Sequence, residues 1–282
     1  MNIKINNELP SLSVAIISRN EEARIARCLE SVRPIAREII VVDSGSSDNT
    51  IMIAESFGAT VYSEEWQGFV GQRNSVMAKC SCEWILFLDC DEVLSASLCK
   101  SIAKAVQDKE CNGYKLKYVS FFMGRWIKHV WSQDWHLRLI RRGQAVWVGH
   151  DVHETINCKE PVKKLDGDAY HFTYVNNEQH LTKGIYYATL GAKSLCARGK
   201  KVKPYMLVIN PVWSLVKHYV VKLGFLDGFP GFVISVTSMY HNFYKYWFAW
   251  EIQNRESIET PDILTTPPCQ PSAEKPLKNR PS

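Results

Sequence analysis

Three groups of polar residues each follow a short apolar run that is typical of a buried strand. They are Ser18-Arg19-Asn20-Glu21, Asp43-Ser44-Gly45-Ser46-Ser47-Asp48 and Asp89-Cys90-Asp91. In an open parallel sheet, ligands bind at the carboxyl ends of the strands. One such group would be ordinary for a loop, but three in succession predict one shared binding site.

The pair Asp89 and Asp91 indicates a divalent cation at that site. Because side chains alternate along a strand, Asp-x-Asp at its end can turn both carboxylates to one side. Two carboxylates that close repel each other unless they share a cation. Mg²⁺ or Mn²⁺, held by one or two carboxylates and by substrate phosphates, meets this need. The structural alternative is that Asp91, or Ser95 beyond it, caps the helix that runs to Val106.

The elements that must position these groups alternate along the first hundred residues. Apolar runs typical of buried strands occur over residues 13–18, 38–43, 59–62 and 84–88. Three separate segments have apolar residues at helical spacing: one begins at Ile25, one extends from Asn177 to Ala197, and one begins near Tyr205. Residues 114–122 and 136–140 are instead β-rich. This alternation predicts an α/β fold with a mostly parallel sheet flanked by helices.

The composition fits a folded globular chain. Of its 282 residues, 46% are hydrophobic and 22% are charged, with a net charge of +5, which excludes global disorder, a collagen and a polytopic membrane protein. Nine cysteines without a CxxC pair or zinc-finger spacing predict free thiols in a reducing cytosol. The first apolar run is followed at once by Arg19-Asn20-Glu21-Glu22, unlike a secretory signal. We therefore expect a cytoplasmic protein.

The last third of the chain is basic and aromatic. Residues 181–250 contain nine Lys and Arg against one acid, Asp227, and residues 205–250 contain 13 of the 32 aromatic residues. The longest charge-free stretch, residues 228–244, has 17 residues, fewer than the roughly 20 of a spanning helix. We expect this segment to lie on an anionic membrane surface. The alternative is that its aromatic residues cover the sheet or form a dimer contact.

The three polar groups, in this order and spacing over about residues 10–155, resemble family 2 glycosyltransferases with the GT-A fold, a Rossmann-like α/β fold. The run Arg138-Leu139-Ile140-Arg141-Arg142, followed by Val152-His153-Glu154, narrows the resemblance to bacterial lipopolysaccharide inner-core β-1,4-glucosyltransferases, whose acceptor is a core heptose. The QxxRW element of processive polysaccharide synthases is absent from the sequence. The resemblance therefore implies the addition of a single hexose, with glucose as the expected sugar, from a UDP-sugar.

The resemblance also implies roles for particular residues. Asp43 would contact the uracil or ribose of the UDP-sugar. Ser18, Arg19 and Glu21 would shape the same pocket. Asp91, helped by Asp89, would bind the metal on the diphosphate. Arg73 would lie close to the nucleotide, the alternative being a solvated helix residue.

An acceptor hydroxyl needs a base, because it is a poor nucleophile at neutral pH. A carboxylate on the opposite face of the sugar can take its proton, and in-line attack then inverts the anomeric centre. Glu154, in a polar cluster after the β-rich segment, is our candidate, and Asp151 is its rival. The same cluster allows a different hypothesis, a metal site of His150, His153, Glu154 and His171, although the spacing is not HExxH.

The expected organisation has three parts. Residues 10–175 would form the GT-A catalytic domain, residues 176–254 a helical extension for acceptor and membrane contact, and residues 255–282 a disordered tail, since six of the 12 prolines lie in the final 22 residues. We expect an inverting hexosyltransferase that is peripheral on the inner face of the cytoplasmic membrane and acts on the lipopolysaccharide core. The alternatives are a protein or another envelope glycan as acceptor, a metal-dependent hydrolase, and a non-catalytic membrane adaptor. We expect no nucleic-acid partner, and the oligomeric state stays open.

Overall fold

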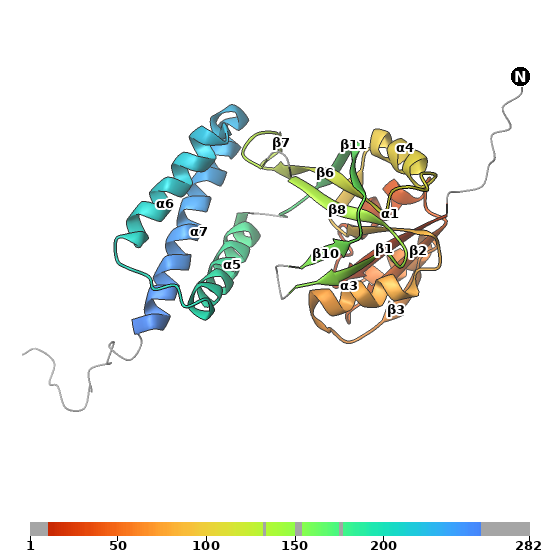
Figure 1. Ribbon diagram of the computed structural model, residues 1–282, viewed down its shortest axis with the longest axis horizontal. Coiled ribbons are helices and arrows are strands. Elements are labelled where there is room, and N and C mark those ends of the chain that lie inside the picture. The colour runs from red at the N-terminus through yellow and green to blue at the C-terminus, as the bar shows by residue number, and fades with distance from the viewer. Residues whose placement is uncertain (1–10, 132–133, 150–153, 175–176, 255–282) are drawn as a thin grey trace, which may run out of the picture.

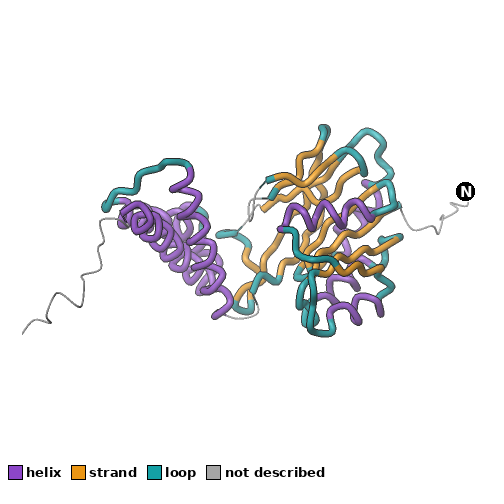
Figure 2. The backbone as a smooth tube through the Cα atoms, turned by 90° about the horizontal axis from the view of Figure 1, so that it is seen from below, coloured by secondary structure: helices purple, strands orange, loops and turns teal. Residues whose placement is uncertain are grey.

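The computed structural model describes residues 11–131, 134–149, 154–174 and 177–254. Strands with flanking helices form one part of the molecule, and long helices form the other (Figures 1 and 2). The strands are β1 Leu12–Ser18, β2 Glu38–Asp43, β3 Thr60–Ser63, β4 Trp84–Asp89, β5 Glu92–Leu94, β6 Gly113–Phe122, β7 Arg125–Ile127, β8 Asp134–Arg141, β9 Ala145–Val148, β10 Thr155–Cys158 and β11 Val162–His171. The helices are α1 Ile25–Val32, α2 Thr50–Ser56, α3 Gly68–Lys79, α4 Ala96–Ala105, α5 Asn177–Ala197, α6 Met206–Val216, the π-helical η1 Lys217–Val221, the 3₁₀-helical η2 Gly224–Asp227, and α7 Gly228–Asn254.

One large sheet forms the centre of the strand-rich part. Its strand order is β3-β2-β1-β4-β8-β6-β11-β5, and β7 pairs with β6. In that row β8 and β5 run opposite to the other strands. β9 and β10 form a separate antiparallel pair. The predicted α/β fold, with a mostly parallel sheet flanked by helices, is confirmed.

The central strands are apolar on both faces, which is why helices cover both sides of the sheet. On one face, Val14 and Leu86 belong to a large core that includes residues of α1, α2 and α4. On the other face, Ala15 and Phe87 pack with residues of α3 and of the β9–β10 pair. The sheet is therefore held rigidly beneath the loops that follow its strands.

The register of these strands brings the three polar groups to one edge. Ser18 at the end of β1 pairs with Asp43 at the end of β2. On the other side of β1, Ile17 pairs with Asp89 at the end of β4. The predicted strands over residues 13–18, 38–43 and 84–88 are confirmed, and so is their common carboxyl edge.

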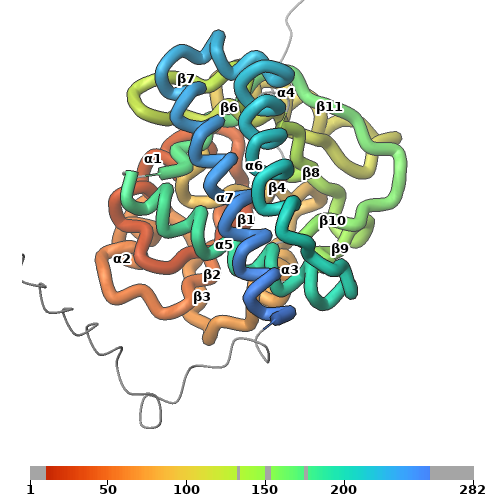
Figure 3. Tube along the Cα trace, turned by 90° about the vertical axis from the view of Figure 1, so that its left-hand side faces the viewer, coloured from red at the N-terminus to blue at the C-terminus, as the bar shows by residue number. Residues whose placement is uncertain are grey.

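Helices α5 and α6 both pack on α7, beside the sheet. In Figure 3, which views the molecule from the side of these helices, they lie in front of the sheet. Between α6–η1 and η2–α7 the chain bends by 67°. The bend needs glycine, because a β-carbon at Gly231 would overlap the carbonyl oxygen of Gly224. No described helix is by itself long and apolar enough to cross a bilayer, whereas this bent pair has the length and composition to do so.

The helices also carry an exposed apolar surface, which we define by residues of α6, η1 and η2 and the turn between them. Its members are Val208, Ile209, Val212, Trp213, Val216, Val220, Val221, Leu223, Phe225 and Leu226. Lys217 and Lys222 are exposed within the same segment. Apolar side chains and cations therefore occur together along it.

Asp227, the one acid of this basic segment, ties the helices to the strand-rich part. The backbone N–H groups of Lys128, His129 and Val130 all donate to its carboxylate over 2.8–3.2 Å. The residue is 7% exposed, so these charge-assisted bonds are shielded from water. Ile234 of α7 packs beside them in a small apolar cluster with Phe122.

Candidate active site

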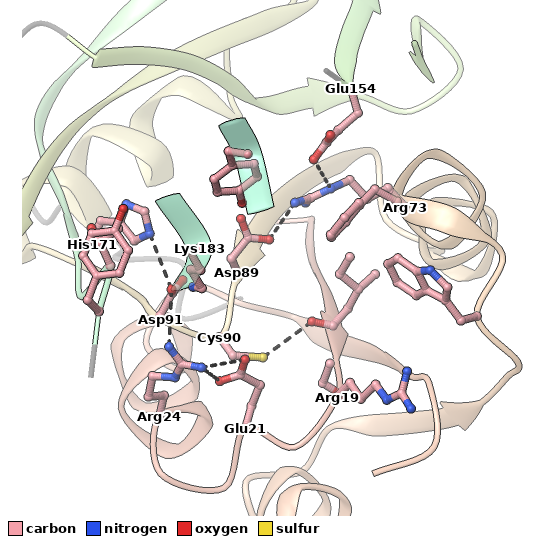
Figure 4. Close-up of a pocket in the computed structure, with 17 residues that line it drawn as sticks. Arg19, Glu21, Arg24, Arg73, Asp89, Cys90, Asp91, Glu154, His171 and Lys183 are labelled. Atoms are coloured by element: carbon pink, nitrogen blue, oxygen red, sulfur yellow. Dashed lines mark hydrogen bonds and ion pairs between the residues drawn. The ribbon is translucent and has the colours of Figure 1, made fainter. Parts of the chain in front are cut away.

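A cavity of about 630 Å³ lies at the carboxyl edge of β1 and β4 (Figure 4). Its charged lining residues are Arg19, Glu21, Arg24, Arg73, Asp89, Asp91, Glu154 and Lys183, with His171 among them. Aromatic side chains of Trp66, Phe69, Tyr174 and Tyr187 complete much of the wall. Most residues that the sequence predicted for the site therefore lie around one cavity.

Asp89 is held by two arginines. Its carboxylate lies 2.8 Å from Arg73 Nη2 and 3.3 Å from Arg138 Nη2. Burial raises the pKa of Asp89, but the two guanidinium groups outweigh burial and lower it below its ordinary value. Asp89 is therefore ionised, and its charge is already balanced by these arginines.

Glu92 lies beneath this arrangement and is 2% exposed. It accepts hydrogen bonds from Asp89 N and from the Tyr118 hydroxyl, at 3.0 and 3.1 Å, and Arg138 lies 3.6 Å away. Burial and the nearby Asp89 raise the pKa of Glu92. No role was predicted for Glu92 or Arg138, yet both contact Asp89 and hold it in place.

Asp91 faces a different part of the cavity. Its Oδ2 lies 3.5 Å from His171 Nε2 and 3.7 Å from Arg24 Nη1, and Figure 4 shows it between the two. Antiparallel pairing of β5 with β11 places His171 here, opposite Glu92. Burial lowers the pKa of His171, but Asp91 outweighs burial and raises it. The alternative role of Asp91 as a helix cap is wrong, because Ser95 Oγ accepts from Leu98 N at the start of α4.

The donor set suits a divalent cation. Among the described lining residues, four Lys and Arg face four Asp and Glu, which leaves no positive surplus for a nucleotide diphosphate. A divalent cation would supply that charge. Asp91 and His171 offer the oxygen and nitrogen ligands that Mn²⁺ accepts, and phosphate oxygens commonly complete such sites. Within the described residues, no group of three or more His, Cys, Asp or Glu is placed to hold a metal, so this part of the chain would contribute two ligands.

Asp43 lies under the cavity rather than in its wall. It is fully buried and accepts from Ser18 Oγ at 2.8 Å and from Ser46 N at 2.7 Å. Gly45 N, at 3.0 Å, adds another bond. In this structure Asp43 therefore shapes the loop after β2, and its direct contact with a uracil or ribose stays a prediction.

Ser18, Arg19 and Glu21 all line the cavity. The Ser18 hydroxyl donates a hydrogen bond to Asp43, and Glu21 forms an ion pair with Arg24 at 2.6 Å. Burial raises the pKa of Glu21 despite Arg24. Arg19 is exposed, so its guanidinium is accessible to a ligand. Arg24, which the sequence did not single out, links Glu21 to Asp91.

Arg73 connects Asp89 to Glu154. It is 5% exposed, so the alternative of a solvated helix residue is wrong. Its Nε lies 3.8 Å from Glu154 Oε1, and its guanidinium stacks 4.6 Å from the ring of Trp147. Asn74 exchanges two hydrogen bonds with the backbone of Trp147, at 2.9 and 3.0 Å. These bonds fix β9 against α3.

Asp151, His150 and His153 lie outside the described residues. The choice between Glu154 and Asp151 as base therefore stays a prediction, and so does the metal site proposed around the two histidines. Glu154 itself has a side chain 18% exposed and reaches the cavity.

Two lining residues come from α5, the first helix of the extension. Lys183 and Tyr187 are four positions apart, so they share one face of the helix and both reach the cavity. The predicted helix over Asn177–Ala197 is confirmed, and this spacing was the signal that could have found the pair. The extension thus contributes directly to the site.

The sheet and its carboxyl-edge cavity define an α/β enzyme of the GT-A type. The chain belongs to glycosyltransferase family 2, because the model of that family, described as glycosyl transferase family 2, matches residues 13–183. The matched region ends within α5, so it includes nearly all residues of the cavity wall. The resemblance seen in the sequence is confirmed.

Related proteins extend the comparison. An uncharacterized glycosyltransferase of Rickettsia typhi is 32% identical over 251 residues, which are 84% of this chain and 86% of the relative. The lipopolysaccharide core biosynthesis glycosyltransferase LpsC of Rhizobium meliloti is 29% identical over 257 residues, 88% of this chain and 94% of the relative.

Solved structures give more distant matches. The mannosyltransferase PcManGT of Pyrobaculum calidifontis, in complex with GDP-Man and Mn²⁺, is 16% identical with a TM-score of 0.47, over 90% of this chain and 89% of that one. The glucosyl-3-phosphoglycerate synthase of Mycobacterium tuberculosis, in complex with Mn²⁺, UDP and its product, is 25% identical with a TM-score of 0.35, over 39% of this chain and 44% of that one.

Proposed function

We propose that this glycosyltransferase moves one hexose, with inversion, from a UDP-sugar to a heptose of the lipopolysaccharide inner core. The observation that carries the proposal is the cavity at the strand ends. Asp91 with His171 lies on one side of it, and Glu154 with Arg73 lies on another (Figure 4). An acidic metal-binding side and a separate carboxylate are the two components that inverting transfer requires.

Positive charge in the cavity would stabilise the leaving group of the reaction, the nucleoside diphosphate. As the anomeric C–O bond breaks, negative charge grows on the departing diphosphate, and fixed cations aimed at it lower the barrier. Arg24 and Lys183 line the cavity on the side of Asp91. A divalent cation, when bound at Asp91 and His171, adds positive charge to the same leaving group.

The attacking side is served by Glu154. Its carboxylate takes the proton of the acceptor hydroxyl as the new glycosidic bond forms, and the diphosphate leaves on the opposite face of the anomeric carbon. The α-linked sugar of the donor then becomes β-linked in the product. Arg73 lies beside Glu154 and helps to orient it, and Arg73 is itself held by Asp89 and Trp147.

The acceptor assignment is supported by the relative LpsC, which is named as a lipopolysaccharide core biosynthesis glycosyltransferase, and by the resemblance of the sequence to inner-core enzymes. The donor assignment rests on that resemblance alone. Both therefore need a direct test on the full-length chain.

A panel of nucleotide sugars tests the function. We expect the protein with Mn²⁺ to release UDP from one UDP-hexose, with UDP-glucose first, and to do so faster when a heptose-containing core oligosaccharide is added. Release is measured by coupled UDP detection, and the anomeric configuration of the product by NMR. Absence of release from every donor of the panel, or a product with the α configuration, would contradict the proposal.

We also propose that the exposed apolar surface of α6, η1 and η2 rests on the inner face of the cytoplasmic membrane. The surface combines large apolar side chains with Lys217 and Lys222. Clusters of exposed apolar side chains are typical of interaction surfaces, and each cation close to an anionic bilayer gains about 1 kcal/mol. A lipid-borne acceptor would then meet the site at the membrane.

Vesicle cosedimentation tests this attachment. Val212→Glu, at a position 51% exposed, is expected to reduce binding to anionic vesicles about tenfold or more, since it puts a charge into the apolar layer. Met52→Glu, at a position 62% exposed on α2, is the matched control and should bind like the unmodified protein. Binding that is indifferent to both Val212→Glu and added salt would refute the attachment.

A further inference from the structure

A second cavity, of about 500 Å³, lies between α5 and α7. This volume falls within the range of roughly 300–1,000 Å³ found for small-ligand sites. The second cavity shares Tyr174 and Tyr187 with the first. A molecule held in it therefore adjoins the reaction site across these two rings.

The two cavities differ in charge. In the described part of the chain, no Lys, Arg, Asp or Glu lines the second cavity, whereas eight charged residues line the first. The wall consists instead of aromatic rings, among them Trp131, Tyr240 and Tyr244, and of neutral polar side chains. A charged group placed here would lose its hydration without gaining a partner. The part of any ligand that enters is therefore uncharged.

Two histidines of the wall have their tautomers fixed by backbone carbonyls. His218 Nδ1 lies 2.7 Å from Ser214 O, and His241 Nδ1 lies 3.0 Å from Gly184 O. A carbonyl only accepts, so Nδ1 carries the proton in both rings and Nε2 is left as an acceptor. Burial lowers the pKa of each imidazole, outweighing the hydrogen bond to the carbonyl, so both rings are neutral near pH 7. Within the described residues neither Nε2 has a hydrogen-bond partner.

Asn242 adds a third acceptor. Its amide nitrogen donates to Ser214 Oγ at 2.9 Å and to Ser238 O at 3.1 Å. This geometry leaves its carbonyl oxygen free of any described partner. These three groups are acceptors without a described partner, and they match a ligand that brings O–H donors. They do not form a metal site among the described residues.

We propose that the second cavity binds a neutral sugar unit of the glycan acceptor. A pyranose ring has hydroxyl donors on its edge and C–H groups on its faces, which match the free acceptors and the aromatic rings of the wall. The inference rests on the proposed function, because it assigns the acceptor side of the same reaction. It also predicts a preference: a sugar without phosphate enters the second cavity, whereas a phosphorylated one is excluded.

Saturation-transfer NMR on the full-length protein tests the inference with three probes: a methyl heptoside, its phosphate monoester, and decanoate. The neutral heptoside should bind, and the phosphate ester should bind at least tenfold more weakly. His241→Asn should weaken heptoside binding about three- to tenfold, because the asparagine amide replaces the bond to Gly184 but leaves no acceptor at the position of Nε2. His241→Gln places an oxygen there and should restore binding. Tyr186→Ala, on the same helix as Tyr187 but outside the cavity, is the matched control.

Each outcome decides the inference. Failure of the neutral heptoside to bind overturns it. Decanoate that displaces the heptoside and ignores both His241 variants assigns the cavity to an acyl chain and also overturns it. Because binding is read without turnover, the result is independent of the donor panel. The sugar can bind while no UDP-hexose is consumed, which would defeat the proposed function alone.

Discussion

Glu154→Gln should bind UDP with Mn²⁺ as the unmodified protein does and should transfer sugar about 10²- to 10⁴-fold more slowly. The substitution preserves the shape of the side chain and removes its basicity, and general-base catalysis is worth about that factor. Binding and turnover separate here, because Glu154 lies beside Arg73 and away from the Asp91–His171 pair. Transfer rates at saturating donor, with calorimetric UDP affinities, measure the two effects.

Two further variants make that result decisive. Glu110→Gln changes an exposed glutamate outside the cavity and should transfer at the normal rate. Asp151→Asn tests the rival base directly. If Glu154→Gln keeps full activity while Asp151→Asn loses it, the assignment of the base to Glu154 is wrong.

Asp91→Asn is expected to lower kcat/KM at least about 100-fold and to abolish the dependence of the rate on Mn²⁺. The amide is nearly isosteric but carries no charge. Without that charge, the site should hold a divalent cation poorly beside the positive guanidinium of Arg24. Loss of a fixed charge aimed at the leaving group costs several kcal/mol of transition-state stabilisation. Initial rates over a Mn²⁺ titration measure both quantities.

The control for this prediction is Asp166→Asn, an exposed aspartate on β11, which should leave the Mn²⁺ titration unchanged. His171→Ala should move the half-maximal Mn²⁺ concentration upward, since it removes the second protein ligand. A Mn²⁺ titration of Asp91→Asn that superimposes on that of the unmodified protein would rule out Asp91 as the metal ligand.

The strands and their common edge were predictable because the information is local. Unbroken apolar runs define β1, β2 and β4, and polar residues follow each run directly. The parallel arrangement then brings those residues together. The same locality made the helix Asn177–Ala197 predictable.

The pairing inside the site was not predictable, because it depends on residues far apart in the sequence. Asp89 was expected to help bind metal, yet Arg73 and Arg138, 16 and 49 positions away, neutralise it. Arg138 arrives because β8 lies between β4 and β6 in the sheet. His171 arrives because β11 pairs with β5. Neither contact can be predicted from the spacing of residues along the sequence.

Asp43 illustrates a different limit. Its place at the end of a strand was predicted correctly, but its hydrogen bonds to the loop after β2 were not predicted. The loop after β2 folds back, so its N–H groups and a serine hydroxyl satisfy the carboxylate beneath the cavity. Position along a strand predicts which edge a residue occupies, whereas the loop conformation decides whether it faces the ligand.

Calorimetric titration of UDP into the unmodified protein tests the central claim most directly. With its equal numbers of described cationic and acidic lining residues, the cavity should bind UDP when Mn²⁺ is present and bind it at least tenfold more weakly in EDTA. Equally tight binding under both conditions would show that the protein's own cations suffice and that the Asp91–His171 pair serves another purpose.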